Sequence, residues 1–296
     1  MYRKLMFAVV TIMTVLTSLT VFSYPHHLTI CAASKIDVSM NISPTYIVTE
    51  VNDEGLIGPI TVSNTGPVPL KIRGFISEGG HDINGIPIIS DSSNNTQTDK
   101  AFLTPEPAEF KLMPGESESV KVIARINGAA PGGIYPIIFF RGQPLDEKTE
   151  REFHTSSQIG VITLITVISD QNQGDISEQA NITSVAIFQD PQSKSVKISA
   201  TCENRGNIHA NLSGTATIKS HLGQVISDTQ LDPAICLPGY KRNITGYINA
   251  PVLKEGIYLA EISVNTEKRI LPSIPVVFQV ADNGKIDTVQ MDFAYP

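Results

Sequence analysis

One short segment of the chain carries side chains that could bind a ligand. His81, Asp82 and Asn84 lie between glycines and offer an imidazole, a carboxylate and an amide. These groups can hold a metal ion or a polar partner, but no second pair of ligands follows at the spacing that a metal site needs. We expect a binding loop without a metal; the alternative is a plain turn that carries a solvated imidazole.

No motif of an enzyme active site is present. The sequence lacks a Gly-x-Ser-x-Gly elbow, a Walker loop, a dinucleotide fingerprint and a His-Glu-x-x-His helix. Residues 170–175 are only superficially similar to a calcium loop, because the glycine comes one position early and the twelfth position is Asn181. We therefore expect no catalysis, no metal and no cofactor.

The composition excludes several classes of partner. The 296 residues include 22 Lys and Arg against 29 Asp and Glu, a net charge of −7, which disfavours binding to a phosphate backbone and so to nucleic acid. Tryptophan is absent and aromatic residues are 6%, so a stacking platform for bases is not expected. The three cysteines are too few for a disulfide scaffold.

The amino terminus predicts export. Arg3 and Lys4 precede an uncharged stretch at residues 5–22, and small residues suit cleavage near Ala33. We expect residues 1–34 to be a signal peptide, with an uncleaved membrane anchor as the alternative. No second apolar stretch of spanning length follows, so the rest of the chain is expected outside the cytoplasm (periplasmic, cell-surface or secreted) and to meet a membrane only through this segment.

Alternating apolar residues predict strands along the rest of the chain. The alternation is found at residues 36–43, 120–126, 196–202, 212–218 and 258–264, with Gly and Pro turns between the runs. Residues 159–168 are apolar on both faces, which predicts a central strand or one that a partner covers. The fold class is therefore all-β, with β-sandwiches after the amino-terminal signal or anchor helix.

An internal repeat predicts two sandwiches in tandem. Each half carries an Asn-x-Gly turn, a Pro-Gly turn and a Gly-Ile-Tyr, which begin at 64, 114 and 133 and again at 204, 238 and 256. The first half carries extra residues, which we place as a loop insertion within 78–100. We expect sandwiches at 35–170 and 179–282, a linker at 171–178 and a carboxyl-terminal tail at 283–296.

The turn and core motifs resemble a known family. Ile-Ser-Pro at 42–44, Ile-Thr-Val-Ser-Asn-Thr-Gly at 60–66, Phe-Lys-Leu-Met-Pro-Gly-Glu-Ser at 110–117 and Gly-Ile-Tyr at 133–135 resemble the amino-terminal domain of PapD-like periplasmic chaperones, and more closely exported proteins that carry such a domain. Residues 203–207, 237–239 and 256–258 are similar to immunoglobulin-like modules of prokaryotic surface proteins. The resemblance implies a fold, and only weakly a function.

The chain departs from the family at the partner site. Those chaperones anchor a subunit's terminal carboxylate with a basic pair on the first and last strands of domain one, whereas here only Lys35 borders the first strand and residues 158–169 hold no Lys or Arg. Standard subunit capping is therefore not expected. Addition of a partner strand remains an alternative, for which Val161, Leu164 and Val167 are the candidate contact residues.

In the resembled sandwich, the strand that ends at Cys202 runs antiparallel beside the strand that opens after Cys236. In an oxidising compartment the two thiols are expected to form a disulfide, which would close a loop of about 34 residues. The alternative is two buried free thiols. Sequons add Asn94, Asn181, Asn211 and Asn243 as glycosylation acceptors, although composition alone could give such a count.

These observations predict an exported, non-catalytic envelope protein that binds another envelope protein or a cell-surface polymer. Contact would be made through the insertion at 78–100, a charged hairpin at 141–158 or an exposed strand edge. One alternative is a periplasmic chaperone that donates a strand to secreted subunits. Another is an accessory binding module of a polysaccharide-processing system.

Overall fold

The structure is a computed structural model that describes residues 38–52, 54–89, 101–126, 131–145, 156–168, 176–190, 195–248, 253–287 and 289–293. These ranges contain strands and turns without a helix, which confirms the all-β expectation. Within them, no helix is long and apolar enough to cross a membrane. The expected leader at 1–34 lies outside the described residues. Asp37–Pro296 forms one compact unit.

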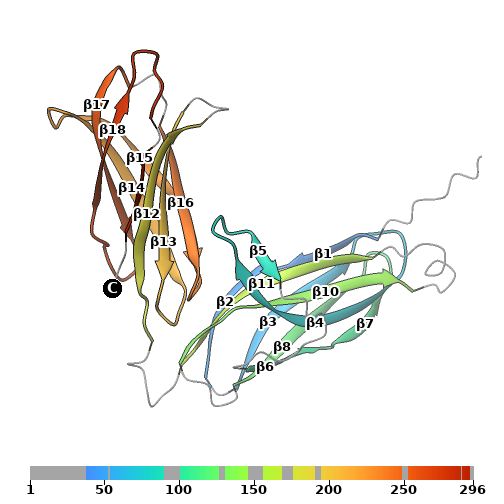
Figure 1. Cartoon of the computed structure of the whole chain (residues 1–296). Coiled ribbons are helices and arrows are strands. Elements are labelled where there is room, and N and C mark those ends of the chain that lie inside the picture. The colour runs from blue at the N-terminus through green and yellow to red at the C-terminus, as the bar shows by residue number, and fades with distance from the viewer. Residues whose placement is uncertain are drawn as a thin grey trace, which may run out of the picture. The chain divides into compact units, whose positions relative to one another are not determined.

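The first eleven strands form two sheets that enclose one core (Figure 1). One sheet has the order β1 (Met40–Ser43), β3 (Glu54–Asn64), β8 (Ser117–Ile126) and β6 (Ala101–Glu106). The other has the order β2 (Tyr46–Val51), β11 (Ser157–Val167), β10 (Pro136–Pro144), β4 (Leu70–His81) and β5 (Pro87–Ile89); β7 (Glu109–Leu112) pairs with β4 and β9 (Gly132–Ile134) with β11. Alternation along β8 places Val120, Val122 and Ala124 in the core between these sheets.

β11 lies between β2 and β10 in its sheet, as its two apolar faces predict, although within the described chain residues 157–161 pair with a strand on one side only. It pairs antiparallel with β10 over residues 157–162 and parallel with β2 over residues 162–167. The parallel pairing arises because the first strand of the sandwich changes sheets between Ser43 and Tyr46: β1 pairs with β3, and β2 pairs with β11.

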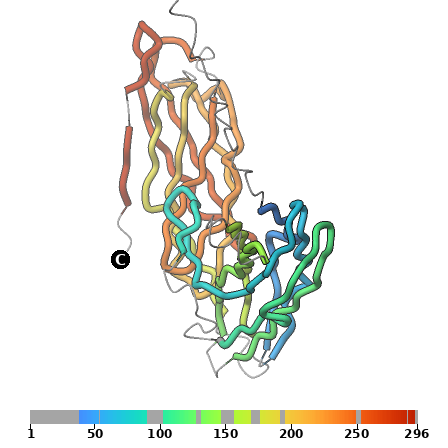
Figure 2. Tube along the Cα trace, turned by 90° about the vertical axis from the view of Figure 1, so that its right-hand side faces the viewer, coloured from blue at the N-terminus to red at the C-terminus, as the bar shows by residue number. Residues whose placement is uncertain are grey.

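The last eight strands form a second pair of sheets. Their orders are β16 (Lys241–Ile248), β13 (Val196–Asn204), β12 (Ala180–Gln189), β19 (Val289–Asp292) and β15 (Val225–Cys236), β14 (Ala210–Ser220), β17 (Gly256–Asn265), β18 (Ile274–Val280). Figure 2 shows β19 beside β12, with which it pairs antiparallel. The segment expected to be a tail from 283 thus contributes an edge strand, and its short, polar sequence explains why no strand pattern was visible.

The internal repeat is confirmed at two buried asparagines. Asn64 Nδ2 donates to the carbonyls of Val68 and Leu112 (2.8 and 3.1 Å), and its Oδ1 accepts from Gly66 N (3.0 Å). Asn204 makes the matching bonds, to Ile208 O and Cys236 O at 2.7 and 2.9 Å and from Gly206 N at 2.9 Å. Each asparagine therefore ties its own turn to a neighbouring strand end inside each sandwich.

The Pro-Gly turns are equivalent as well. Gly115 and Gly239 have φ values of 82° and 78°, a region that suits glycine. Their N–H groups donate to the carbonyls of Asn64 and Asn204, respectively. The same turn therefore closes against the same asparagine in both halves.

The linker at 171–178 stays a prediction. No sheet of the described chain combines strands from before and after this segment, and its composition is polar. We expect limited proteolysis to cut within 171–178 before it cuts either sandwich, and to give two resistant fragments on a denaturing gel. Early cuts inside β1–β11 or β12–β19 would contradict this division.

Candidate functional site

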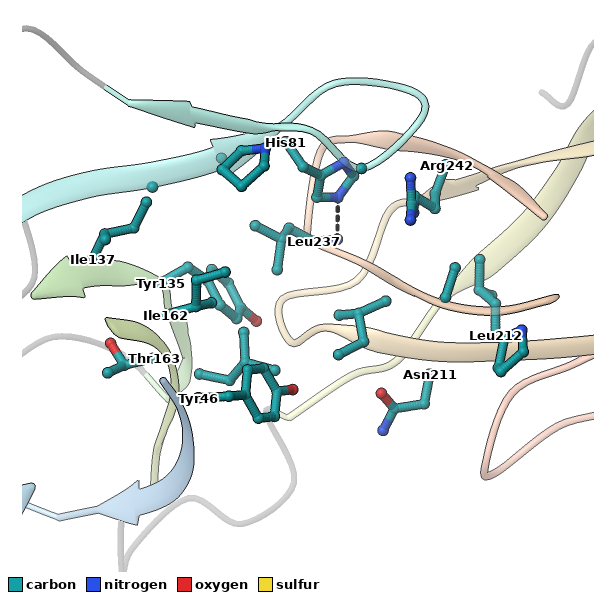
Figure 3. A pocket seen from close by; sticks show the side chains of 18 residues that line it. Tyr46, His81, Tyr135, Ile137, Ile162, Thr163, Asn211, Leu212, Leu237 and Arg242 are labelled. Carbon is teal, nitrogen blue, oxygen red and sulfur yellow. Dashed lines mark hydrogen bonds between the residues drawn. The ribbon is translucent and has the colours of Figure 1, made fainter. Parts of the chain in front are cut away.

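A cavity of about 430 Å³ lies where the first set of strands meets the second (Figure 3). Its walls are mainly apolar. The first sandwich contributes Tyr46, Tyr135, Ile137, Ile162 and Leu164, and the second contributes Leu212, Ile235 and Leu237. The polar groups on its walls include His81, Arg242 and Asn211. We call this cavity the junction pocket.

Arg242 on β16 is the one cation among the residues that line the junction pocket. Its Nε and Nη1 atoms are buried and have no hydrogen-bond partner among the described residues. Gly85 leaves room for the guanidinium, because a Cβ at this position would collide with it. A buried cationic donor without a partner is unfavourable, so this group favours an anion in the pocket.

His81, at the end of β4, bonds to the second sandwich through its ring. Its Nε2 accepts from Leu237 N at 3.0 Å, as the dashed line in Figure 3 marks. The proton must therefore lie on Nδ1, which donates to Asp82 O at 2.7 Å. The side chain is buried, and this burial lowers the pKa of His81, with the charge of Arg242 acting in the same direction.

The predicted binding loop contacts the second sandwich. Ile83 O accepts from Asn243 N at 2.8 Å, and Asn84 Oδ1 accepts from Asn243 Nδ2 at 3.3 Å. Asp82 Oδ1 accepts from the amides of Asn84 and Ile86, which closes the turn. The solvated imidazole considered as the alternative for His81 is wrong, since the backbone of Leu237 holds the ring. The described residues hold no cluster that could bind a metal.

A second set of contacts joins the sandwiches near Gly133. Gly133 N donates to Asn207 O at 2.6 Å, and Asn207 Nδ2 donates to Pro131 O at 3.1 Å. The rings of Tyr135 and His209 meet edge to face with 5.9 Å between centroids. Burial also lowers the pKa of His209. Of these two histidines, His81 lines the junction pocket, whereas His209 is half-buried beside Tyr135.

Two of the three candidate partner-strand residues are corrected by the structure. Val161 and Val167 are 0% and 2% exposed and belong to the first core, so a partner cannot contact their side chains. Leu164 lines the junction pocket. The backbone edge of residues 157–161 opposite β10 has no partner strand in the described part of the chain.

Cys202 and Cys236 lie together in the second core as free thiols. Cys236 Sγ is 3.9 Å from the carbonyl oxygen of Cys202 and 3.2 Å from that of Tyr240. Burial raises the pKa of Cys202 to about 12 and that of Cys236 to about 11. The strand that ends after Cys202 (β13) pairs antiparallel with the strand that follows Cys236 (β16), as expected. The disulfide itself stays a prediction.

The sequon asparagines differ in environment. Asn181 lies half-buried on β12, and Asn211 donates to Glu267 Oε1 at 2.7 Å on the pocket wall. Asn243 accepts from Thr201 Oγ1 at 2.7 Å, besides its contacts with the loop at 82–85. Asn94, residues 90–100 of the insertion and the charged hairpin tip at 146–152 lie outside the described residues.

Sequence reasoning missed Arg242 as a pocket residue. It follows the Pro-Gly turn as part of a polar Lys-Arg-Asn run that is typical of a solvated strand end. Its neighbour in the pocket, Gly85, is 157 positions earlier in the chain, so no local pattern could connect them.

Comparison with solved structures finds chains from structures of chaperones. A structure of the Acinetobacter baumannii CsuC–CsuE chaperone–tip adhesion subunit complex is 10% identical, covers 81% of this chain and 98% of that chain, and has a TM-score of 0.37. The Pseudomonas aeruginosa CupB2 chaperone is 11% identical over 86% of this chain and 100% of that chain, with a TM-score of 0.35. A structure of the Salmonella enterica SafA pilin–SafB chaperone complex is 14% identical over 81% of this chain and 96% of that chain, with a TM-score of 0.36.

No protein-family model matches the chain. No curated protein matches it either. Structural similarity at these identities and TM-scores carries no conclusion about activity or partner, which must come from the chain's own residues.

Proposed function

We propose that this chain is an exported, non-catalytic protein that binds the end of an extended, apolar polypeptide in the junction pocket. Arg242 would pair with the terminal carboxylate, and the apolar walls would hold the last side chains. The observation that carries the proposal is the pair of buried Arg242 nitrogens, Nε and Nη1, which have no partner among the described residues and lie in a mainly apolar pocket. The end of an apolar polypeptide carries both a carboxylate, which Arg242 can bind, and apolar side chains, which the walls can hold.

Charge-assisted hydrogen bonds in a desolvated site supply both affinity and direction. A carboxylate at Arg242 would accept from one of the two buried atoms, Nε or Nη1, whose N–H groups face different sides of the planar guanidinium. The volume of about 430 Å³ falls within the range of small-ligand pockets and suits one or two side chains rather than a folded partner.

The unpaired edge of β11 supports the same partner. Within the described part of the chain, residues 157–161 pair with β10 on one side only, and Ile162 and Leu164, next along the strand, line the pocket. An extended polypeptide could add a strand at this edge and place its end beside Arg242. The partner would then be another envelope protein. This corresponds to the chaperone alternative, except that the anchoring cation, Arg242, would lie on the second sandwich.

A peptide with and without a free carboxylate tests the proposal. The probe is an acetylated octapeptide of alternating valine and threonine that ends in phenylalanine; its affinity for the full chain is measured by calorimetry. We expect Arg242→Gln to weaken binding roughly 10- to 100-fold, the effect of losing a charge-assisted bond. Amidation of the peptide should have a similar effect on the wild-type chain and little effect on the variant.

The matched control is Arg269→Gln, which removes an exposed arginine of the same sandwich and should leave affinity unchanged. Equal affinity of the acid and amide peptides would contradict the proposal. Binding of purified cell-wall polymer in place of either peptide would favour the accessory-module alternative.

A further inference from the structure

We infer that His81 is an acid-sensitive fastener of the junction pocket, which holds the junction closed when the ring is neutral and loosens it when the ring is protonated. The fastener itself stands on the contacts of the ring. Its consequence for ligand binding rests on the proposed function.

Both ring nitrogens of His81 already have partners, and the contact at Nε2 requires the neutral form. Nε2 accepts from Leu237 N at 3.0 Å, and Nδ1–H donates to Asp82 O at 2.7 Å. A second proton would go to Nε2 and face the N–H of Leu237, so that two donors would point at each other. The side chain is only 9% exposed, which leaves little water to replace the lost bond.

The groups around the ring do not favour an imidazolium. Arg242 from β16 places a like charge nearby, and the Tyr240 ring lies 5.0 Å away, centroid to centroid. Asp82 is the one nearby carboxylate, and its Oδ1 is used by the amides of Asn84 and Ile86. Tyr135 on the opposite wall and the thiol of Cys236, next to Leu237, are both uncharged at neutral pH, because burial raises the pKa of each.

The sign of the pH effect follows from these contacts. Burial, and then Arg242, lower the pKa of His81 below its usual 6.5, although its contacts with Asp82 oppose the shift. The closed junction is therefore intact above about pH 6.5, and the open form gains the proton first as the pH falls. The amide contacts of Asn243 with the loop at 82–85 do not titrate, so the expected change is a loosened junction and not full separation.

Hydrogen exchange of the Leu237 amide measures directly how often the bond to His81 opens. The full chain is labelled with 15N-leucine, and the protection of Leu237, corrected for the intrinsic rate, is compared between about pH 7.5 and about pH 5. We expect protection to fall by about tenfold or more at the lower pH, the effect of losing one buried bond.

His81→Gln supplies an acceptor oxygen that does not titrate, so its Leu237 amide should be protected to the same extent at both pH values. His221→Gln changes an exposed histidine and should behave as the wild type. Unchanged Leu237 protection in the wild-type chain would overturn the inference. A wild-type pH response in His81→Gln would also overturn it, and would point to His209 as the titrating group.

Affinity for the carboxylate peptide is measured on the same samples. A fall in affinity with pH that His81→Gln abolishes would link the fastener to the pocket. Loss of Leu237 protection without any peptide binding would leave the fastener standing and contradict only the proposed function.

Discussion

Replacement of Asn204 by alanine should lower the free energy of unfolding by about 3–5 kcal/mol, because three buried backbone groups lose their partner at once. The side chain is fully buried, and it bonds to the carbonyls of Ile208 and Cys236 and to the N–H of Gly206. Urea denaturation followed by circular dichroism measures the effect.

Asn204→Asp is the sharper version of this test. It keeps the shape and the acceptor for Gly206 N, but it turns a carboxylate oxygen toward the carbonyls of Ile208 and Cys236. The folded state then raises the pKa of the new carboxyl above about 3.9, so the variant should gain stability as the pH falls toward that value. A variant that is least stable in acid would contradict the described network.

Asn64→Ala should lower the free energy of unfolding by a similar amount, since Asn64 is 1% exposed and makes the matching bonds. The two sites lie in separate cores, so their effects should add. Asn211→Ala is the control: the Asn211 side chain donates to the exposed carboxylate of Glu267, and we expect a change within about 0.5 kcal/mol. A small effect at Asn64 beside a large one at Asn204 would contradict the equivalence of the repeats.

The repeat could be predicted from the sequence because turn chemistry is local. Asparagine followed by glycine two positions on favours one backbone shape, and Gly115 and Gly239 require the φ values that they adopt. Alternation also predicted the strands, because each sheet of a sandwich buries one of its two faces in the core. The edge strand β19 was missed, since its residues are mostly exposed and show no buried period.

The junction pocket could not be predicted in this way. The partner of His81 is the backbone N–H of Leu237, which every residue except proline carries, so the sequence holds no sign of a bond between positions 156 apart. The error at Val161 and Val167 has a similar origin. Their pattern is compatible with a partner on either face, and only the sheet order shows that these side chains enter the first core.

Oxidation of Cys202 and Cys236 should raise the free energy of unfolding by about 3 kcal/mol, through the closed loop of 34 residues. The two thiols would lose two protons and two electrons to a small disulfide such as glutathione disulfide, which becomes two thiols. Because burial raises the pKa of Cys202 to about 12 and that of Cys236 to about 11, the thiolate that must attack is scarce in the folded chain at neutral pH. The bond should therefore form during folding and not after it.

Two oxidation experiments with Cys31 replaced by serine separate these routes. Refolding of the reduced chain with glutathione disulfide should consume both thiols, whereas the same reagent added to the folded, reduced chain should leave them free over the same time. Cys236→Ala is the control in which no internal bond can form. If both thiols stay free after oxidative refolding, the pair is a packing element of the second core, and reduction should then leave the stability of the refolded chain unchanged.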